Sequence, residues 1–495
     1  MPSATDPRAA SRSTLLFALG LIVLYVGIMT AKFALWRANV LMNDWSFYNN
    51  NLWNTNFRDL WLFSHDRFIQ FGYPSYLNEH FAPLLLALAA LYGLLPQTPG
   101  EAMLLLLHGA SPIVAALFIH ATALHLLNDR RLAATIALTY ALSPGILWPT
   151  ISLVYGFQPD CFLAPLAAMA GWALAKRRDG MFYLALLLAL GVKENVPAYG
   201  AILGTCLVLF TARRKLGLIT IVISLSVFVL ASKGIPLITG VENRNVGRVW
   251  AFIDDVLHLR PHFDYTLPEI LVGLGYSAVF LPAVWVWPYL AMLGPDLLLI
   301  GQVSYAKLVT WHVMLPVTVL GLCATFGTAH ILATTHWPAA LDARIARPKL
   351  VRLYWTAMLC ISLIVGPVTI WLAYDRYIAL ASPVDQAAVA KALGLIPKVA
   401  GLAVTSDLEQ YFARRAVMSS KPDVLGPAAA KFTYAAVNRR GITPARRDGP
   451  LGPVTRQDEC LIAVADGIAR AGGAVMDEGG ILVVKFAAMP KLACP

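Results

Sequence analysis

The chain has 495 residues, of which 58% are hydrophobic and 14% are charged. A globular protein carries about 25% charged residues, so this composition excludes an ordinary water-soluble protein and indicates a polytopic membrane protein. The formal net charge of +11 does not indicate a nucleic-acid-binding protein, because the Lys and Arg residues fall largely in short clusters between apolar runs.

The first apolar run covers residues 14–36. It is longer than the core of a signal peptide and no small-residue cleavage site follows it, so we predict a retained first span that starts in the cytoplasm. Residues 39–83 come next and are too polar to cross a bilayer, yet rich in Trp, Tyr and Phe. Aromatic side chains prefer the headgroup level, and their spacing of roughly three to four residues predicts helices lying on the outer membrane surface.

Acidic residues and a histidine lie at both ends of this aromatic stretch. Asp44 is near its start, and Glu79 and His80 stand directly before the next apolar run. An acid held at the lipid–water boundary beside a second acid and an imidazole can remove a proton from a hydroxyl group or bind a divalent metal ion, which makes all three candidates for either role. The alternative is that Asp44 caps a helix and His80 anchors the chain at the interface.

The remaining apolar runs predict a mainly α-helical bundle of about eleven spans. Residues 81–96 form a short run with prolines near both ends, and a crossing there would place the basic cluster 128–131 outside, so we predict a re-entrant or interfacial helix. Further spans are expected at residues 101–127, 132–150, 161–175, 181–192, 196–210, 216–238, 269–290, 291–303, 312–332 and 355–374. Residues 37–100 and 239–268 then form outer loops of a membrane domain that covers residues 1–375.

Ionisable residues at the ends of spans are functional candidates, because each costs on the order of 3 kcal/mol in the middle of a bilayer unless it is paired. Lys193 and Glu194 either pair with each other or, with Arg244 or Lys233, bind the phosphate of a lipid carrier. Asp160 either joins Asp44 in one outer site or caps a helix. The other candidates for substrate binding are Arg248 and His312, of which His312 is alternatively an interfacial anchor.

The composition after residue 375 is that of a soluble domain, residues 376–495. Helices are expected at residues 384–394, 407–415 and 458–473, strands at 400–406 and 432–438, and a terminal hairpin at 474–486. The count of spans puts this small α/β domain outside the cell membrane, in an oxidising space. We therefore expect Cys460 and Cys494, its two cysteines, to form a disulfide.

Five sequence motifs carry a family resemblance: "DWSFYNNNLWN", "NEHFAPLLLALAALYGLLP", "YGFQPD", "GVKEN" and "VTWHVMLP". In this order they resemble an uncharacterised prokaryotic family of predicted membrane proteins, domain-of-unknown-function family 2079. That family is similar in layout to the GT-C glycosyltransferases, such as the protein O-mannosyltransferases, which have an acidic residue in the first outer loop and a polyprenyl-phosphate sugar donor. On this resemblance Asp44 matches the acidic position, His80 the histidine that ends the loop, and Lys193 with Glu194 a later basic–acidic pair.

The resemblance implies a GT-C-like transferase of the bacterial inner membrane that passes a sugar from a polyprenyl-phosphate carrier to an envelope glycan, lipid or protein on the outer face. Asp44 is then the base or a metal ligand supported by Glu79 and His80, and Lys193 holds the phosphate with Arg244 or Arg248. The alternative is a non-catalytic transporter or lipid-binding scaffold. A transporter is expected to repeat its interrupted helices, and only one interruption, at residues 193–195, is seen.

Overall fold

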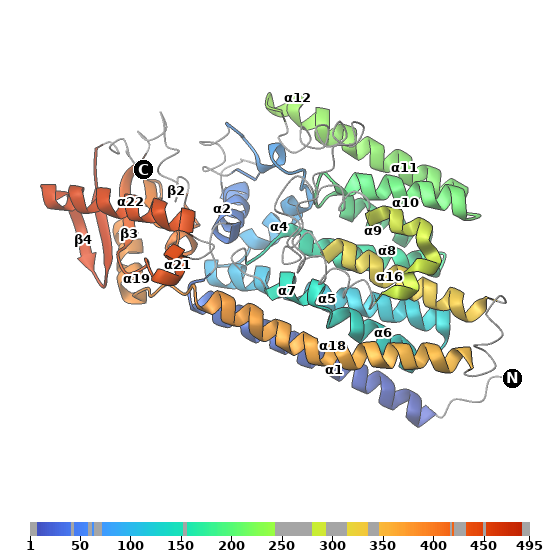
Figure 1. Ribbon diagram of the computed structural model, residues 1–495. Coiled ribbons are helices and arrows are strands. Elements are labelled where there is room, and N and C mark those ends of the chain that lie inside the picture. Colours follow the sequence, from blue (N-terminus) through green and yellow to red (C-terminus); the bar gives the residue numbers. More distant parts are fainter. Residues whose placement is uncertain are drawn as a thin grey trace.

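The structure is a computed structural model in which a bundle of α-helices carries a small α/β domain at one end (Figure 1). It describes residues 7–40, 44–57, 62–63, 72–151, 156–242, 280–293, 314–334, 346–415, 418–419, 432–448 and 452–487. The expected spans at residues 269–290 and 291–303 fall largely outside these ranges.

Five of the described helical stretches are long and apolar enough to cross a membrane. They are α1 (Pro7–Arg37), of which Thr14–Arg37 qualifies, α5 (Gln97–Leu127), the continuous stretch Arg214–Thr239, α16 (Met314–Ala333) and α18 (Arg347–Ile378), of which Arg347–Asp375 qualifies. A sixth is possible if α6 (Arg130–Ala141) and α7 (Pro144–Ile151), which meet at a 45° bend, form one broken span. The bend falls at Pro144, which cannot continue the hydrogen-bond ladder of α6.

The other apolar helices in the described ranges are shorter than a span, so the expected count of eleven is not confirmed. They are α4 (Leu84–Gly93), α8 (Leu163–Ala175) with the 3₁₀ turn η2 (Pro159–Phe162) before it, α9 (Asp179–Leu190) and α10 (Val196–Phe210). A helix of 12 residues such as α9 is about 18 Å long, less than the roughly 30 Å of a hydrocarbon core. The ten residues of α4 agree with the prediction that this run does not cross.

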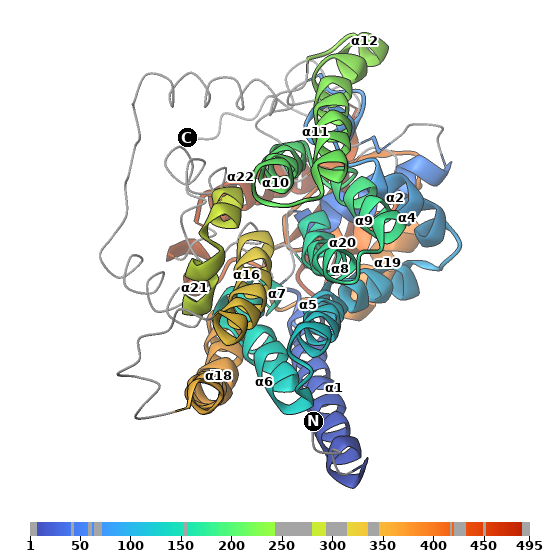
Figure 2. The same ribbon diagram turned by 90° about the vertical axis from the view of Figure 1, so that its right-hand side faces the viewer.

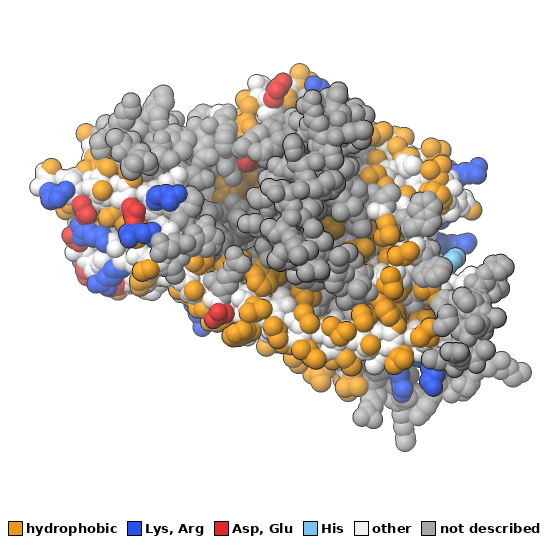
Figure 3. Space-filling view, viewed as in Figure 1, with side chains coloured by type: hydrophobic (Ala, Val, Ile, Leu, Met, Phe, Trp, Pro, Cys, Tyr) orange, Lys and Arg blue, Asp and Glu red, His pale blue; other side chains and the backbone are white. Residues whose placement is uncertain are grey.

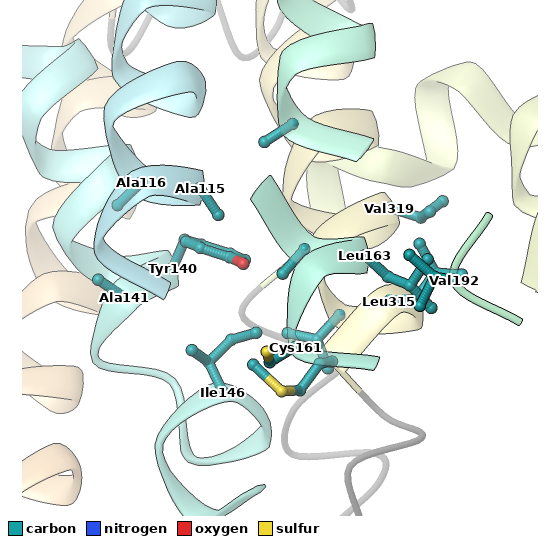
Figure 4. Packing of buried hydrophobic residues seen from close by; sticks show 14 of the residues in the cluster. Ala115, Ala116, Tyr140, Ala141, Ile146, Cys161, Leu163, Val192, Leu315 and Val319 are labelled. Carbon is teal, nitrogen blue, oxygen red and sulfur yellow. The ribbon is translucent and has the colours of Figure 1, made fainter. Parts of the chain in front are cut away.

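The long and short helices lie roughly side by side, and Figure 2 shows them nearly end-on, with α5 between α1, α6 and α8. Apolar side chains from several of them form one core; Figure 4 shows Tyr140, Ile146, Cys161 and Leu315 meeting in it. The N-terminus and the α/β domain are at opposite ends of the bundle (Figure 1). Exposed basic residues lie at the end of the bundle that holds the N-terminus. They belong to the α5–α6 turn, the α8–α9 turn and the start of α18, and Figure 3 shows Lys and Arg side chains at this end.

The α/β domain has a five-stranded sheet in the order β2-β1-β3-β5-β4. β1 (Gly401–Val404) pairs in parallel with β2 (Met418–Ser419) and with β3 (Phe432–Asn438), and β5 (Ile481–Lys485) is antiparallel to β3 and to β4 (Ala474–Glu478). α19 (Gln386–Leu395), α20 (Glu409–Phe412), α21 (Pro444–Asp448) and α22 (Gly452–Ile468) complete it. The expected strands, hairpin and α19 are present, whereas the two-residue β2 was not predicted from the sequence.

Backbone carbonyl groups of the α/β domain dock it on the bundle. The Nδ2 atom of Asn39, just after α1, donates to the Asp407 carbonyl at 2.8 Å. Asn50 Nδ2, on α2 (Asp44–Phe57), donates to the Ala413 and Arg415 carbonyls, each at 2.8 Å. These contacts place the segment after β1 against the end of α1 and against α2.

Candidate functional site

Four charged side chains meet at the end of the bundle that holds the α/β domain. They come from three separate segments: His80 follows the 3₁₀ turn η1 (Tyr76–Asn78), Asp160 lies in η2, and Lys193 with Glu194 forms the corner between α9 and α10. Each segment is short and non-helical or 3₁₀, because prolines stop the neighbouring helices: Pro83 precedes α4 and Pro197 opens α10. The helices therefore hold the four groups at their ends.

His80 and Glu194 form the first hydrogen-bonded pair of this site, and it is an ion pair when the imidazole is protonated. His80 Nδ1 lies 2.9 Å from Glu194 Oε1 and 3.1 Å from Oε2, and the Phe81 amide donates to the same carboxylate at 3.1 Å. The imidazole is 23% exposed and the carboxylate only 5%. Burial by itself raises the pKa of Glu194, but the charge of His80, its hydrogen bond and the nearby Lys193 outweigh burial and hold the pKa below its ordinary value.

Lys193 and Asp160 form the second ion pair, with 3.0 Å between Lys193 Nζ and Asp160 Oδ1. Both side chains are buried, so the pair is shielded from the screening that weakens surface ion pairs. The alternative in which Lys193 and Glu194 form an ion pair with each other is not the one seen, because each pairs with a residue from another segment. The N-cap alternative for Asp160 is also wrong, since Gln158 is the N-cap residue of η2.

Tyrosine hydroxyls connect these pairs to α2. The Tyr48 hydroxyl donates to Gln158 Oε1 at 3.0 Å and lies 2.8 Å from the Tyr76 hydroxyl. The Tyr76 ring in turn lies 5.3 Å from the His80 ring, measured between centroids. Through Tyr48, α2 thus contacts the residues of η1 and the segment before η2. The helix covers Asp44–Phe57, which confirms the prediction that part of the aromatic stretch is helical.

The other predicted site residues are not members of these two pairs. Glu79 is buried, and its backbone amide closes η1 by donating to the Tyr76 carbonyl. Asp44 is the first residue of α2, but its side chain is outside the described part, as are all of Arg244, Arg248 and His312. Lys233 is exposed. The Val241 carbonyl accepts from Asn78 Nδ2 at 2.8 Å; Val241 is three residues before Arg244 in sequence, and Asn78 is two residues before His80.

The described ranges contain no group of three or more His, Cys, Asp or Glu side chains arranged to hold a metal ion. His80 Nδ1 is already in contact with Glu194, and Asp160 with Lys193, so these groups do not converge on one point. The described residues therefore do not fit a bound divalent metal, and the chemistry below uses none.

Sequence reasoning missed a fully buried cation, Lys32, and its neighbour His108. Lys32 lies inside the first apolar run, "VGIMTAKFALW", and a lysine within a span is itself a signal of function, since it is costly there. Its Nζ is 3.0 Å from His108 Nδ1, on α5. Tyr48 and Tyr76 were also missed, because aromatic residues in such a stretch are read as interfacial anchors.

Solved structures with a similar arrangement include ArnT from Cupriavidus metallidurans, bound to undecaprenyl phosphate (TM-score 0.49, 14% identity) and in the apo state (TM-score 0.48, 11% identity). Each match covers 95% of this chain, and 97% and 98% of the respective ArnT chains. The apo oligosaccharyltransferase of Archaeoglobus fulgidus matches with a TM-score of 0.38 and 13% identity over 89% of this chain and 71% of its own.

No curated protein matches the sequence. The family model described as "Predicted membrane protein (DUF2079)" matches residues 43–423, which is most of the chain and includes α2, both ion pairs and β1. The five motifs noted in the sequence span residues 44–316 and lie within these limits. The chain therefore belongs to the DUF2079 family of predicted membrane proteins.

Proposed function

We propose that the protein is a glycosyltransferase that moves a sugar from a polyprenyl-phosphate carrier to a hydroxyl group of an envelope acceptor. The reaction takes place at the bundle end that carries the α/β domain, which we assign to the outer face of the inner membrane, with the N-terminus in the cytoplasm. The observation that carries the proposal is the His80–Glu194 pair: a partly exposed imidazole held by a buried carboxylate.

Such a pair is suited to general base catalysis. Glu194 accepts a hydrogen bond from Nδ1–H of His80, which leaves the lone pair of the neutral imidazole on Nε2. The base removes the proton of the acceptor hydroxyl as its oxygen bonds to the anomeric carbon. The bond from that carbon to the phosphate oxygen breaks, and the polyprenyl phosphate leaves with the electron pair. Asp44 remains the second candidate for this base.

The leaving phosphate needs positive charge, and Lys193 is the described residue best placed to supply it. Its ammonium is held by Asp160, so phosphate binding requires Lys193 to share its hydrogen bonds between the two anions. We propose Arg244 or Arg248 as the further cation, because their loop starts at Glu242, next to the contact between Val241 and η1. His312 is kept as a candidate contact to the acceptor.

The test is transfer by the purified full chain in liposomes, from radiolabelled polyprenyl-phosphate sugars to extracted envelope material. Lipid that co-purifies with the protein is identified by mass spectrometry. A labelled product and a bound polyprenyl phosphate support the proposal. Bound polyprenyl phosphate with no transfer of any tested sugar favours the lipid-binding scaffold, and ordinary phospholipid alone rejects the proposal.

A further inference from the structure

Lys32 is a fully buried lysine, 0% exposed, near the end of α1 that faces the α/β domain. Its amino group donates to the Thr150 carbonyl at 2.9 Å and to the Gly156 carbonyl at 3.2 Å. It also lies 3.0 Å from His108 Nδ1, which is itself 2.9 Å from the Gly156 carbonyl. No carboxylate is among these partners. A methionine of similar volume would avoid the cost of burying a charge, so packing alone does not account for a lysine here.

Lys32 contacts the chain on both sides of residues 152–155, which lie outside the described part. Thr150 is the second-last residue of α7, and Gly156 opens the segment 156–160, which we call the Asp160 loop. Gln158 and Asp160 are the next polar residues of this loop, and they contact Tyr48 and Lys193. Lys32 and the candidate site therefore contact the same loop.

Gly156 fixes the loop further, because its φ of +58° is in the left-handed region that favours glycine. A Cβ atom at this position would lie 2.4 Å from a ring atom of Trp45 on α2, too close for any side chain. Gly156 thus contacts both the Trp45 ring and the Lys32 amino group.

We propose that Lys32 is a positioning residue, whose amino group ties Gly156, at the start of the Asp160 loop, to the end of α7 so that Asp160 meets Lys193. The placement of the loop is independent of the reaction; only its effect on transfer rests on the proposed function. Cys161 provides a natural reporter. It follows Asp160, it is 0% exposed and free, and Figure 4 shows it packed beside Ile146.

The first experiment measures the rate at which a maleimide labels Cys161 in detergent-solubilised protein, with Cys360→Ser removing the exposed free thiol. Lys32→Met removes the Lys32 donor from both carbonyl groups and leaves Gly156 only its contact with His108 Nδ1, so labelling should become at least about tenfold faster. Arg37→Met, which removes an exposed cation from the same helix, should label like the wild type. Wild-type protection of Cys161 in folded Lys32→Met overturns the proposal. If Lys32→Met does not fold, Lys32→Gln replaces it, with the same two outcomes.

The second experiment is a double-mutant cycle on transfer with Lys32→Met and Asp160→Asn. If Lys32 acts through Asp160, each change raises the KM for the carrier lipid, and the double variant is no worse than Asp160→Asn alone. A general loss of stability would instead multiply the two effects, which overturns the positioning role. If the wild type transfers no sugar, the proposed function fails while the labelling rates still decide the role of Lys32.

Discussion

Glu194 contacts two groups that precede it by more than a hundred residues: its carboxylate accepts from His80 and from the Phe81 amide. The distance of 2.9 Å between His80 Nδ1 and Glu194 Oε1 joins the end of the first outer loop to the corner between α9 and α10. A charged hydrogen bond of this kind sets the tautomer of the imidazole as well as its orientation. Catalysis by His80 would depend on both.

Glu194→Gln should therefore lower transfer by a factor of about a hundred, because the amide does not stabilise the imidazolium that forms when His80 takes a proton. The glutamine keeps an oxygen that accepts from the Phe81 amide, so the fold should be retained. The measurement is kcat over a pH series, with thermal stability recorded for each protein. Asp179→Asn is the matched control: it removes an exposed carboxylate, paired with Arg213, from the other end of α9. Equal losses in both variants would show that His80 is not the base.

Much of the α/β domain was predictable from the sequence, because each element there repeats one local pattern. β3 coincides with the predicted strand at residues 432–438, and the paired glycines at 479–480 marked the β4–β5 turn with φ values of +62° and +85°. β2 was missed, because two residues carry no periodic signal. In the membrane part the order of helices was predictable, but twelve to fifteen apolar residues do not distinguish a span from a short buried helix.

The candidate site was predictable as a set of residues and not as a set of pairs. Charge near the ends of apolar runs identified His80, Asp160, Lys193 and Glu194. Which carboxylate meets which cation depends on where η1 and η2 lie against the corner at residues 191–195, and sequence spacing holds no information on that. Lys32 was overlooked for a different reason: a single charge does not interrupt an apolar run of more than twenty residues, so the run was read only as a span.

Asp44→Asn separates the two candidate bases. If Asp44 removes the acceptor proton, the asparagine keeps the shape without the charge, and turnover should fall by a factor of about a hundred or more with little change in folding. If Asp44 only caps the start of α2, asparagine is an equally good cap and activity should be unchanged. The assay compares transfer and thermal stability of this variant with those of Glu194→Gln. Full activity of a well-folded Asp44→Asn protein leaves His80 as the base.

Asp458 predicts a pH dependence of the α/β domain. Burial first, and then the charge of Asp407, raise its pKa from 3.8 to about 7, although Ser406 donates to it from its amide at 2.7 Å and from its hydroxyl at 2.5 Å. The folded state therefore binds the proton more tightly than the unfolded state. Its contribution to stability is fully present below about pH 4 and is lost as the pH rises through about 7.

Asp458→Asn should remove this dependence, since asparagine stays neutral throughout the range. The measurement is the midpoint of urea unfolding of the full chain at a series of pH values between 4 and 8. Unfolding is monitored by the fluorescence of a probe attached to the α/β domain. The wild type should lose stability across this range more steeply than the variant. Asp477→Asn, at an exposed carboxylate paired with Arg439, is the control. Parallel pH curves for the wild type and Asp458→Asn would contradict the assignment.

The last prediction concerns the compartment of the α/β domain. The described basic clusters at residues 176–178 and 213–215 lie in the turns that follow α8 and α10. The opposite ends of these helices reach the candidate site. The basic clusters therefore lie at the end of the bundle away from the α/β domain (Figure 1). Basic loops stay in the cytoplasm, which places the domain outside, in an oxidising space. Cys460 is disulfide-bonded, and Cys494, its expected partner, lies outside the described residues.

In whole cells, single cysteines introduced at the exposed positions Glu242 and Arg440 should react with a reagent that does not cross the inner membrane, and one at Lys176 should react only after that membrane is permeabilised. These probes are placed in a background without Cys360, and with Cys460 and Cys494 retained. Cys460→Ser should then expose a new thiol at Cys494 without added reductant, because the disulfide is broken. Two free thiols in the non-reduced wild-type domain would exclude the bond. Labelling at Lys176 alone in intact cells would invert the topology and move the candidate site to the cytoplasmic face, where envelope acceptors are absent.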